Sequence, residues 1–216
     1  MTTRLRISCF ILSLSLLSAC AVLRDETPER TVRVKLVADA KLRENDPRWH
    51  ETAAGLLRAA SDFYEREFGI KFVAVQIDPW KMEEGSQFVV TLMKRLVQAY
   101  PAKDRNSAYD LLVGFTGERV TFYMGGRGMV NRFGNCRDGL ANYVVSAVTA
   151  PYRYTGATKE PTLDVVALIH EFGHVFGAEH VKDTNSIMNE DFDYRSDFDA
   201  KSRGIVAKNR FCPFGK

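Results

Sequence analysis

This 216-residue chain has little net charge: 30 lysines and arginines stand against 27 aspartates and glutamates. Setting aside Arg4 and Arg6, which lie in an N-terminal targeting segment, leaves 28 basic residues against 27 acidic ones. A chain without an excess of positive charge lacks the electrostatic footprint of nucleic-acid binding, so we expect no nucleic-acid partner. No low-complexity tract or internal repeat is visible, and the length suits one domain, which we expect to be a monomer.

Two segments resemble ligand-binding loops but lack residues that such loops need. The run GGRGMVN at residues 125–131 misses the third glycine of a dinucleotide-binding loop, and no helix clearly follows it, so we expect a flexible rim loop. In the acidic stretch NEDFDYRSDFD at 189–199, Arg195 and Ser196 stand where an EF-hand needs a ligand and a glycine. We expect a solvated loop there, with an irregular calcium site as the alternative.

The N-terminal segment has the features of a targeting sequence. Arg4 and Arg6 precede an apolar run at residues 7–17 that is too short to span a bilayer comfortably. The following LSAC at 17–20 resembles the bacterial lipobox. That resemblance predicts a signal peptide at residues 1–19, acylation of Cys20, and a lipidated tether at 20–30. It implies a lipoprotein anchored to the membrane of a bacterial cell envelope, and alanine after Cys20 favours the outer membrane. An ordinary secretory signal is the alternative.

The cysteines are few, and their positions restrict what they can do. Cys9 would leave with the signal peptide and Cys20 would carry lipid, so Cys136 and Cys212 remain. In an oxidising compartment a remaining pair predicts a disulfide, with two unpaired thiols as the alternative. The wide spacing excludes a zinc or redox site of the CxxC type.

Histidine is also scarce, and three of the four histidines fall within HEFGHVFGAEH at residues 170–180. His170 and His174 are four residues apart, so on a helix both side chains leave the same face and can reach one metal ion. Gly177 would let the chain turn sharply out of the helix. His180 can then complete a set of three ligands.

Three protein ligands and one open position are typical of catalytic zinc. Glu171 is adjacent to the first ligand, where it can contact a zinc-bound water without occupying a coordination position. The alternatives are a helix with buried, hydrogen-bonded histidines and a zinc site with only a structural role. In the second case Glu171 would have no reason to be present.

The run fits H-E-x-x-H-x-x-G-x-x-H at every fixed position and resembles the metzincin zinc metalloproteases. Met188, within the tripeptide Ser186-Ile187-Met188, matches the second hallmark of that family, a methionine beneath the histidines. The form of both motifs is most similar to the matrixin-like branch. Astacins and serralysins carry a tyrosine two residues after the methionine, where this chain has Glu190, which disfavours those two branches.

Hydrophobic patterning predicts alternating strands and helices, and hence an α/β fold with a mostly parallel twisted sheet. The metzincin resemblance implies the same order (an α+β zincin): about five strands, one of them an antiparallel edge strand, packed on the zinc helix. We expect one catalytic domain over residues 31–216 and the substrate-binding edge within 120–133. The predicted strands are 31–37, 71–77, 109–115, 120–124 and 142–148, and the predicted helices are 46–68, 86–100 and 162–176.

These features predict a zinc-dependent endopeptidase that holds one Zn²⁺ and acts on protein or peptide substrates. Glu171 would assist attack of a zinc-bound water on the peptide carbonyl and return the proton to the leaving amine. The main alternative is a non-enzymatic zinc-binding envelope lipoprotein used in adhesion or assembly. A hydrolase of non-peptide amides is a further alternative.

Overall fold

The computed structural model describes residues 28–215, with gaps at 82–84, 105–107, 121–126, 158–159 and 192–194. The predicted signal peptide and the predicted acylation site, Cys20, lie outside the described residues. No helix among the described residues is long and apolar enough to cross a membrane.

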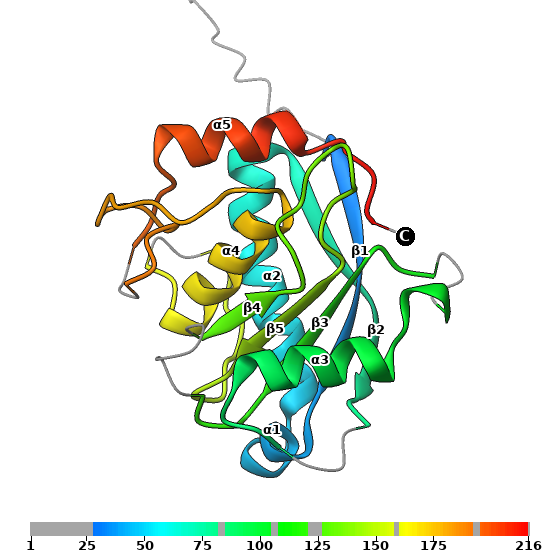
Figure 1. Cartoon of the computed structure of the whole chain (residues 1–216). Helices are drawn as coiled ribbons and strands as arrows, with labels where there is room; N and C mark the ends of the chain where they lie inside the picture. Colours follow the sequence, from blue (N-terminus) through cyan, green and yellow to red (C-terminus); the bar gives the residue numbers. More distant parts are fainter. Residues whose placement is uncertain are drawn as a thin grey trace, which may run out of the picture.

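The described residues form a five-stranded sheet in the order β2-β1-β3-β5-β4 (Figure 1). The pairs β1–β2, β1–β3 and β3–β5 are parallel, and β4 alone pairs antiparallel, with β5. The predicted α/β fold with one antiparallel edge strand is therefore confirmed. The strands are β1 (Arg30–Ala38), β2 (Ile70–Pro79), β3 (Leu111–Thr116), β4 (Gly128–Val130) and β5 (Tyr143–Ala147).

Three of the helices coincide with those expected from the sequence, whereas two were not predicted. The expected ones are α2 (Trp49–Phe68), α3 (Val89–Ala99) and α4 (Leu163–Val175). The short α1 (Ala40–Asn45) and the C-terminal α5 (Ala200–Asn209) are additional, as is a single 3₁₀ turn at Ala102–Asp104. Each of the two additional helices begins with an aspartate cap, Asp39 or Asp199, whose side chain accepts a backbone N–H of the first turn.

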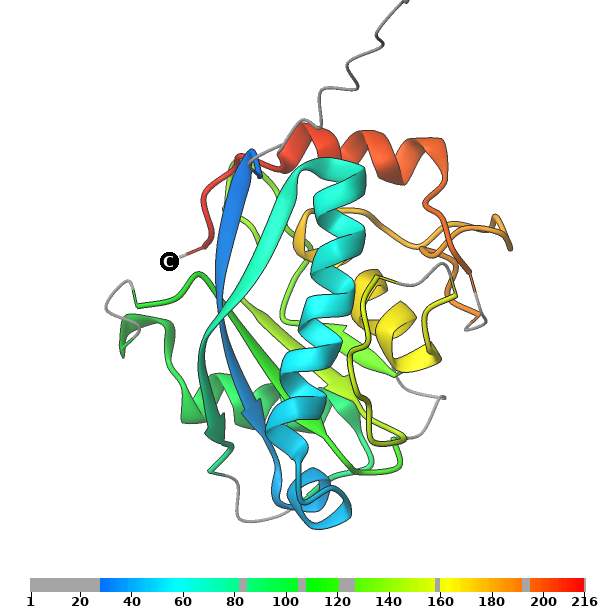
Figure 2. The ribbon, with the colours of Figure 1, turned by 180° about the vertical axis from the view of Figure 1, so that it is seen from behind.

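The helices cover both faces of the sheet. Figures 1 and 2 show α3 on one face and α2 with α4 on the other, while α5 crosses one end. The larger core lies between the sheet and the α2–α4 layer, and a smaller one lies beneath α3. On β1, Val34 and Leu36 enter the larger core whereas Val37 enters the smaller one, as strand alternation requires.

The antiparallel strand lies later in the chain than its predicted position. Val120 is outside any strand, and the rest of the predicted 120–124 strand lies outside the described residues. The strand begins at Gly128, inside the segment 120–133 expected to supply the substrate-binding edge. A three-residue strand with a glycine gives a weak hydrophobic pattern, which explains the misplacement.

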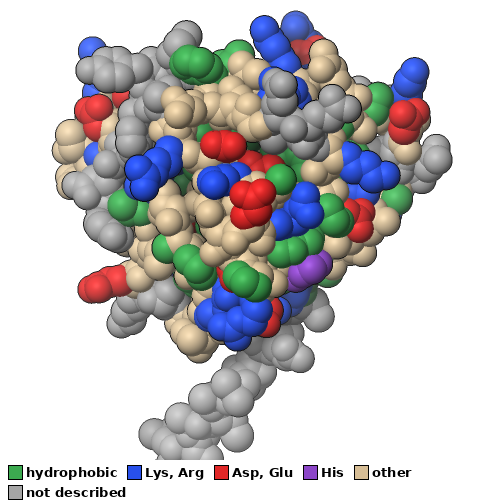
Figure 3. All heavy atoms as spheres, turned by 90° about the horizontal axis from the view of Figure 1, so that it is seen from below, with side chains coloured by type: hydrophobic (Ala, Val, Ile, Leu, Met, Phe, Trp, Pro, Cys, Tyr) green, Lys and Arg blue, Asp and Glu red, His purple; other side chains and the backbone are tan. Residues whose placement is uncertain are grey.

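The surface around α1 mixes charges of both signs. Figure 3 shows acidic side chains beside basic ones on the face seen from below. Part of this mixing is local pairing, because Lys41 lies 3.7 Å from Glu44, and Arg48 lies 3.5 Å from Glu51.

Candidate metal centre

Helix α4, which is almost entirely buried, carries two of the three histidines. Thr162 caps its N-terminus by accepting a hydrogen bond from the backbone N–H of Val165. Every residue of the helix after Leu163 is buried. His170 and His174 leave the same face and are only 3% and 4% exposed. Their positions are therefore fixed by the packing of the helix.

After α4 ends, the chain turns back toward the helix at a glycine. Gly177 has a φ of 94°, which residues with a side chain rarely adopt. A Cβ at this position would also lie 2.2 Å from the carbonyl oxygen of Gly134. Just beyond the turn, the backbone N–H of Ala178 donates to the carbonyl of Gly173 at 3.0 Å. This reversal places His180 beside the two helical histidines.

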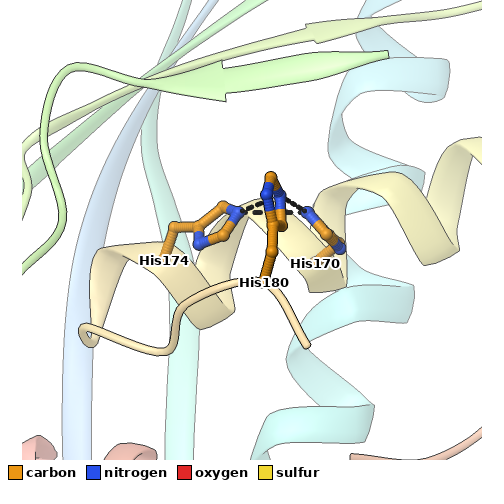
Figure 4. Close-up of side chains that lie close together, drawn as sticks. All are labelled: His170, His174 and His180. Carbon is orange, nitrogen blue, oxygen red and sulfur yellow. Dashed lines mark hydrogen bonds between the residues drawn. The ribbon is translucent and has the colours of Figure 1, made fainter. Parts of the chain in front are cut away.

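The Nε2 atoms of the three histidines converge (Figure 4). They lie 3.0 Å apart for His170 and His174, 3.1 Å for His174 and His180, and 3.2 Å for His170 and His180. Within the part of the chain that the structure describes, this is the one group of three or more histidine, cysteine or acidic side chains gathered closely enough to hold a metal ion.

The other ring nitrogen, Nδ1, of each of the two helical histidines contacts a backbone carbonyl oxygen. Nδ1 of His170 lies 2.6 Å from the carbonyl oxygen of Ile187, and Nδ1 of His174 lies 2.6 Å from that of Ala178. Since a carbonyl can only accept, each Nδ1 carries the hydrogen, and the Nε2 of a neutral ring then presents a lone pair. The third ring differs, because Nδ1 of His180 lies 4.0 Å from the carboxylate of Glu190.

This arrangement fits a zinc ion. Burial lowers the pKa of His170 to about 3 and that of His174 to about 4, so both rings are neutral near pH 7. Lone pairs that face one another repel unless a cation lies between them. Tetrahedral zinc separates nitrogen ligands by about 3.3 Å, close to the 3.0–3.2 Å found here.

Met188 lies beneath this centre and is fully buried. A Cβ added to Gly173, between the two helical histidines, would lie 2.5 Å from the Met188 sulfur. The turn that carries it is fixed by Ser186, whose Oγ accepts from the Met188 backbone N–H at 3.1 Å and donates to Asp199 at 2.8 Å. The methionine expected beneath the histidines therefore packs directly on α4.

Glu171 is buried beside the histidines, with one oxygen left without a partner. It is 4% exposed, and its Oε2 has no hydrogen-bond partner among the described residues. Burial raises the pKa of its carboxyl to about 8. The side chain lies against the edge strand, because a Cβ on Gly128 would be 2.7 Å from both its Cγ and its Oε1.

Comparison with known proteins identifies the family. A model described as metallo-peptidase family M12 matches residues 28–215, most of the chain. The chain belongs to metallopeptidase family M12. A search of curated proteins gave no match. Together, the family and the three histidines make this chain a metallopeptidase.

In this M12 domain a disulfide secures the segment between β4 and β5. Cys136 is bonded to Cys212, which lies 76 positions later in the sequence, and their Cα atoms are 4.9 Å apart. The same segment is bonded to the end of α4: the Gly134 N–H donates to the His174 carbonyl at 3.0 Å, and the Ala141 N–H to that of Val175 at 3.3 Å. The segment between β4 and β5 is therefore attached both to the C-terminal segment and to α4.

Three residues near the centre of this M12 domain lie within the segment 120–133 expected to bind substrate, but their contacts were not predicted from the sequence. Gly128 was assigned to a flexible rim loop but lies in β4 against Glu171. Phe133 packs its ring on His174, with centroids 4.7 Å apart. Arg127 pairs at 3.0 Å with Asp164, an acid buried in the first turn of α4. These contacts join segments far apart in sequence, so no local pattern predicts them.

The acidic segment after Met188 has structural partners in this M12 domain. Asp199 accepts from Ser186 and caps α5, and Asp197 lies 3.6 Å from the guanidinium of Arg203. These contacts connect the segment to α5 and to the methionine turn.

Proposed function

We propose that this metallopeptidase is a zinc endopeptidase in which His170, His174 and His180 hold the metal and Glu171 moves the proton. The observation that carries the proposal is the convergence of three Nε2 atoms beside a buried carboxylate with an unpartnered oxygen. When bound, zinc supplies a Lewis acid that polarises a peptide carbonyl and lowers the pKa of water.

Glu171 has the position that proton transfer requires. A zinc ion held by the histidines would oppose the effect of burial on the pKa of Glu171, so its unpartnered Oε2 can accept a proton from the attacking water and later donate it to the leaving amine. Its other oxygen is confined by β4, since the space beside Oε1 is too small for a methyl group on Gly128. The carboxylate is therefore held in one orientation before substrate arrives, which favours catalysis.

Among the described residues no strand pairs with the outer edge of β4, which supports extended peptides as substrates. The backbone of Arg127 accepts from Ala147 and that of Asn131 donates to Tyr143, so alternate residues of this strand face β5. The backbone groups of Gly128 and Val130 consequently point away from β5. A substrate strand can pair with them and lie over α4 and its histidines, which is recognition by strand addition.

Cleavage of peptides blocked at both ends tests the function. The full chain should cut internal bonds of a broad blocked library, lose activity on chelation and regain it with zinc. Blocked ends exclude exopeptidases, so internal cuts identify an endopeptidase. Full zinc occupancy without any cut would favour the alternative, a non-enzymatic zinc-binding envelope protein.

We also propose that this M12 metallopeptidase is a lipoprotein of a bacterial envelope, with a methionine turn similar to that of the matrixin-like branch. The LSAC sequence at 17–20 supports acylation of Cys20, and the S-I-M tripeptide with Glu190 two residues after Met188 supports this similarity. Replacing Cys20 with alanine should move the protein from the detergent phase to the aqueous phase in phase partitioning. Unchanged partitioning would reject the anchor.

A further inference from the structure

An exposed aromatic ring lies on one of the proposed metal ligands. The ring of Phe133 is tilted by 31° to the His174 ring at a centroid distance of 4.7 Å, yet Phe133 remains 48% exposed. A singly exposed apolar side chain is ordinary on a protein surface, but this one lies directly on a proposed metal ligand, where a bound substrate can cover it. Its contact with His174 uses one side of the ring, and the exposed remainder is available to another apolar group.

The backbone around Phe133 is held on both sides, so the ring has a fixed place. The next residue, Gly134, donates its N–H to the carbonyl of His174 at 3.0 Å. On the preceding side, the guanidinium of Arg132 donates to the carbonyls of Asp138 at 2.8 Å and Leu140 at 3.1 Å. The disulfide at Cys136 secures the same loop. A fixed aromatic surface costs little entropy when a partner packs on it.

The course of the chain places Phe133 on one side of the reacting bond. The edge strand passes Glu171 at Gly128 and reaches His174 at Phe133. Antiparallel pairing is the commoner arrangement of neighbouring strands, and a substrate strand paired with β4 in this way runs in the opposite direction, so it meets Phe133 before Glu171. Residues on the N-terminal side of the cleaved bond therefore reach the ring. The Phe133 ring lies 4.7 Å from the ring of His174, and the metal side of His174 lies beyond that ring. Because a strand advances about 3.4 Å per residue, the Phe133 ring is about two residues from the cleaved bond.

We infer that Phe133 is a specificity-determining residue, which binds an apolar or aromatic substrate side chain about two residues before the cleaved bond. This inference rests on the proposed endopeptidase function. Packing of two aromatic side chains beyond the backbone contacts corresponds to a preference of roughly tenfold for phenylalanine over alanine. The preference should appear mainly in KM, because the ring contacts the substrate away from the reacting atoms.

Matched peptides and a matched variant test the inference. Phenylalanine or alanine is placed in turn at each of the four residues before the cleaved bond. Wild type should prefer phenylalanine at one position by roughly tenfold in kcat/KM, and Phe133→Ala should lose that preference while keeping its zinc. Phe88→Ala is the control, since Phe88 is also 48% exposed but precedes α3 on the other face of the sheet. It should behave as wild type.

Binding measured without cleavage separates this inference from the proposed function. The affinity of the same peptides is measured for Glu171→Ala and for Glu171→Ala with Phe133→Ala, both loaded with zinc. The first should prefer the phenylalanine peptide and the second should not. An equal preference in both, or cleavage by wild type and Phe133→Ala with the same profile, would overturn the role of Phe133. Selective peptide binding without cleavage by wild type would instead overturn the endopeptidase function.

Discussion

Gly128→Ala offers a sharp test of how the edge strand positions Glu171. The added Cβ would lie 2.7 Å from Cγ and Oε1 of Glu171 and 2.9 Å from Cδ, whereas ordinary contacts are 3.4–4 Å. Gly128 is not among the glycines with positive φ, so alanine can adopt its backbone conformation. The perturbation is therefore a steric one directed at the carboxylate.

The expected loss follows from the displacement. Restoring contact distance requires the carboxylate or the strand to move by about 0.7 Å, and a misplacement near 1 Å costs about 100-fold in rate. We expect kcat to fall by roughly 10- to 100-fold. The KM should change little, because the backbone groups of Gly128 that face the substrate are retained. The zinc content should equal that of wild type.

Steady-state kinetics on a blocked peptide, with metal analysis of the same samples, is the assay. Gly204→Ala is the matched control: it introduces the same methyl group in α5, where a Cβ would have nothing within 4 Å. That variant should keep full activity and gain roughly 0.5–1 kcal/mol of stability from helix propensity. A Gly128→Ala enzyme with wild-type kcat would refute the idea that β4 confines Glu171.

Three further predictions concern stability. The guanidinium of Arg153 holds the pKa of Asp46 at about 2, below its ordinary value. Asp46→Asn should therefore lower the free energy of unfolding by about 2 kcal/mol at pH 7. This acid stabilises the fold only while ionised, so the difference should persist above about pH 4 and shrink as the pH falls toward 2. Replacing both cysteines of the 136–212 disulfide with alanine should cost up to about 4 kcal/mol in denaturant unfolding, because the bond closes a long loop. Gly173→Ala should cost about 1–3 kcal/mol, because its methyl group would overlap the buried sulfur of Met188.

Each of these has a result that contradicts it. An Asp46→Asn penalty that stays constant between pH 7 and pH 2 would show that its charge is not what stabilises the fold. Unchanged unfolding after removal of both cysteines would show that the disulfide adds nothing to stability. A fully stable Gly173→Ala would mean that the methionine turn can move away from α4.

The cluster of three histidines was predictable because all three lie within eleven consecutive residues. The helical spacing of four and the glycine turn bring His170, His174 and His180 together locally, so their convergence can be predicted without knowledge of the rest of the fold. The strand and helix order was also predictable, because α2 is 20 residues long with one apolar face and β3 is a continuous apolar run. The disulfide followed from elimination among four cysteines.

The remaining features depend on tertiary contacts that carry no local pattern. Helix α5 has a weak apolar face with only Ser202 and Val206 buried, so periodicity does not reveal it. The edge strand is three residues long. Its first residue is a glycine because a Cβ there would clash with the side chain of Glu171. Phe133 lies within the segment 120–133 expected to bind substrate, but nothing in the sequence indicates that its ring packs on His174.

The most direct test of the central claim compares wild type with Glu171→Ala on one blocked peptide library, with zinc measured in both samples. Glu171 is predicted to transfer the proton without holding the metal, so the variant should keep its fold and about one zinc per chain. It should lose cleavage by several orders of magnitude. Equal cleavage by both proteins, each with zinc bound, would contradict the assignment of Glu171 and with it the proposed mechanism.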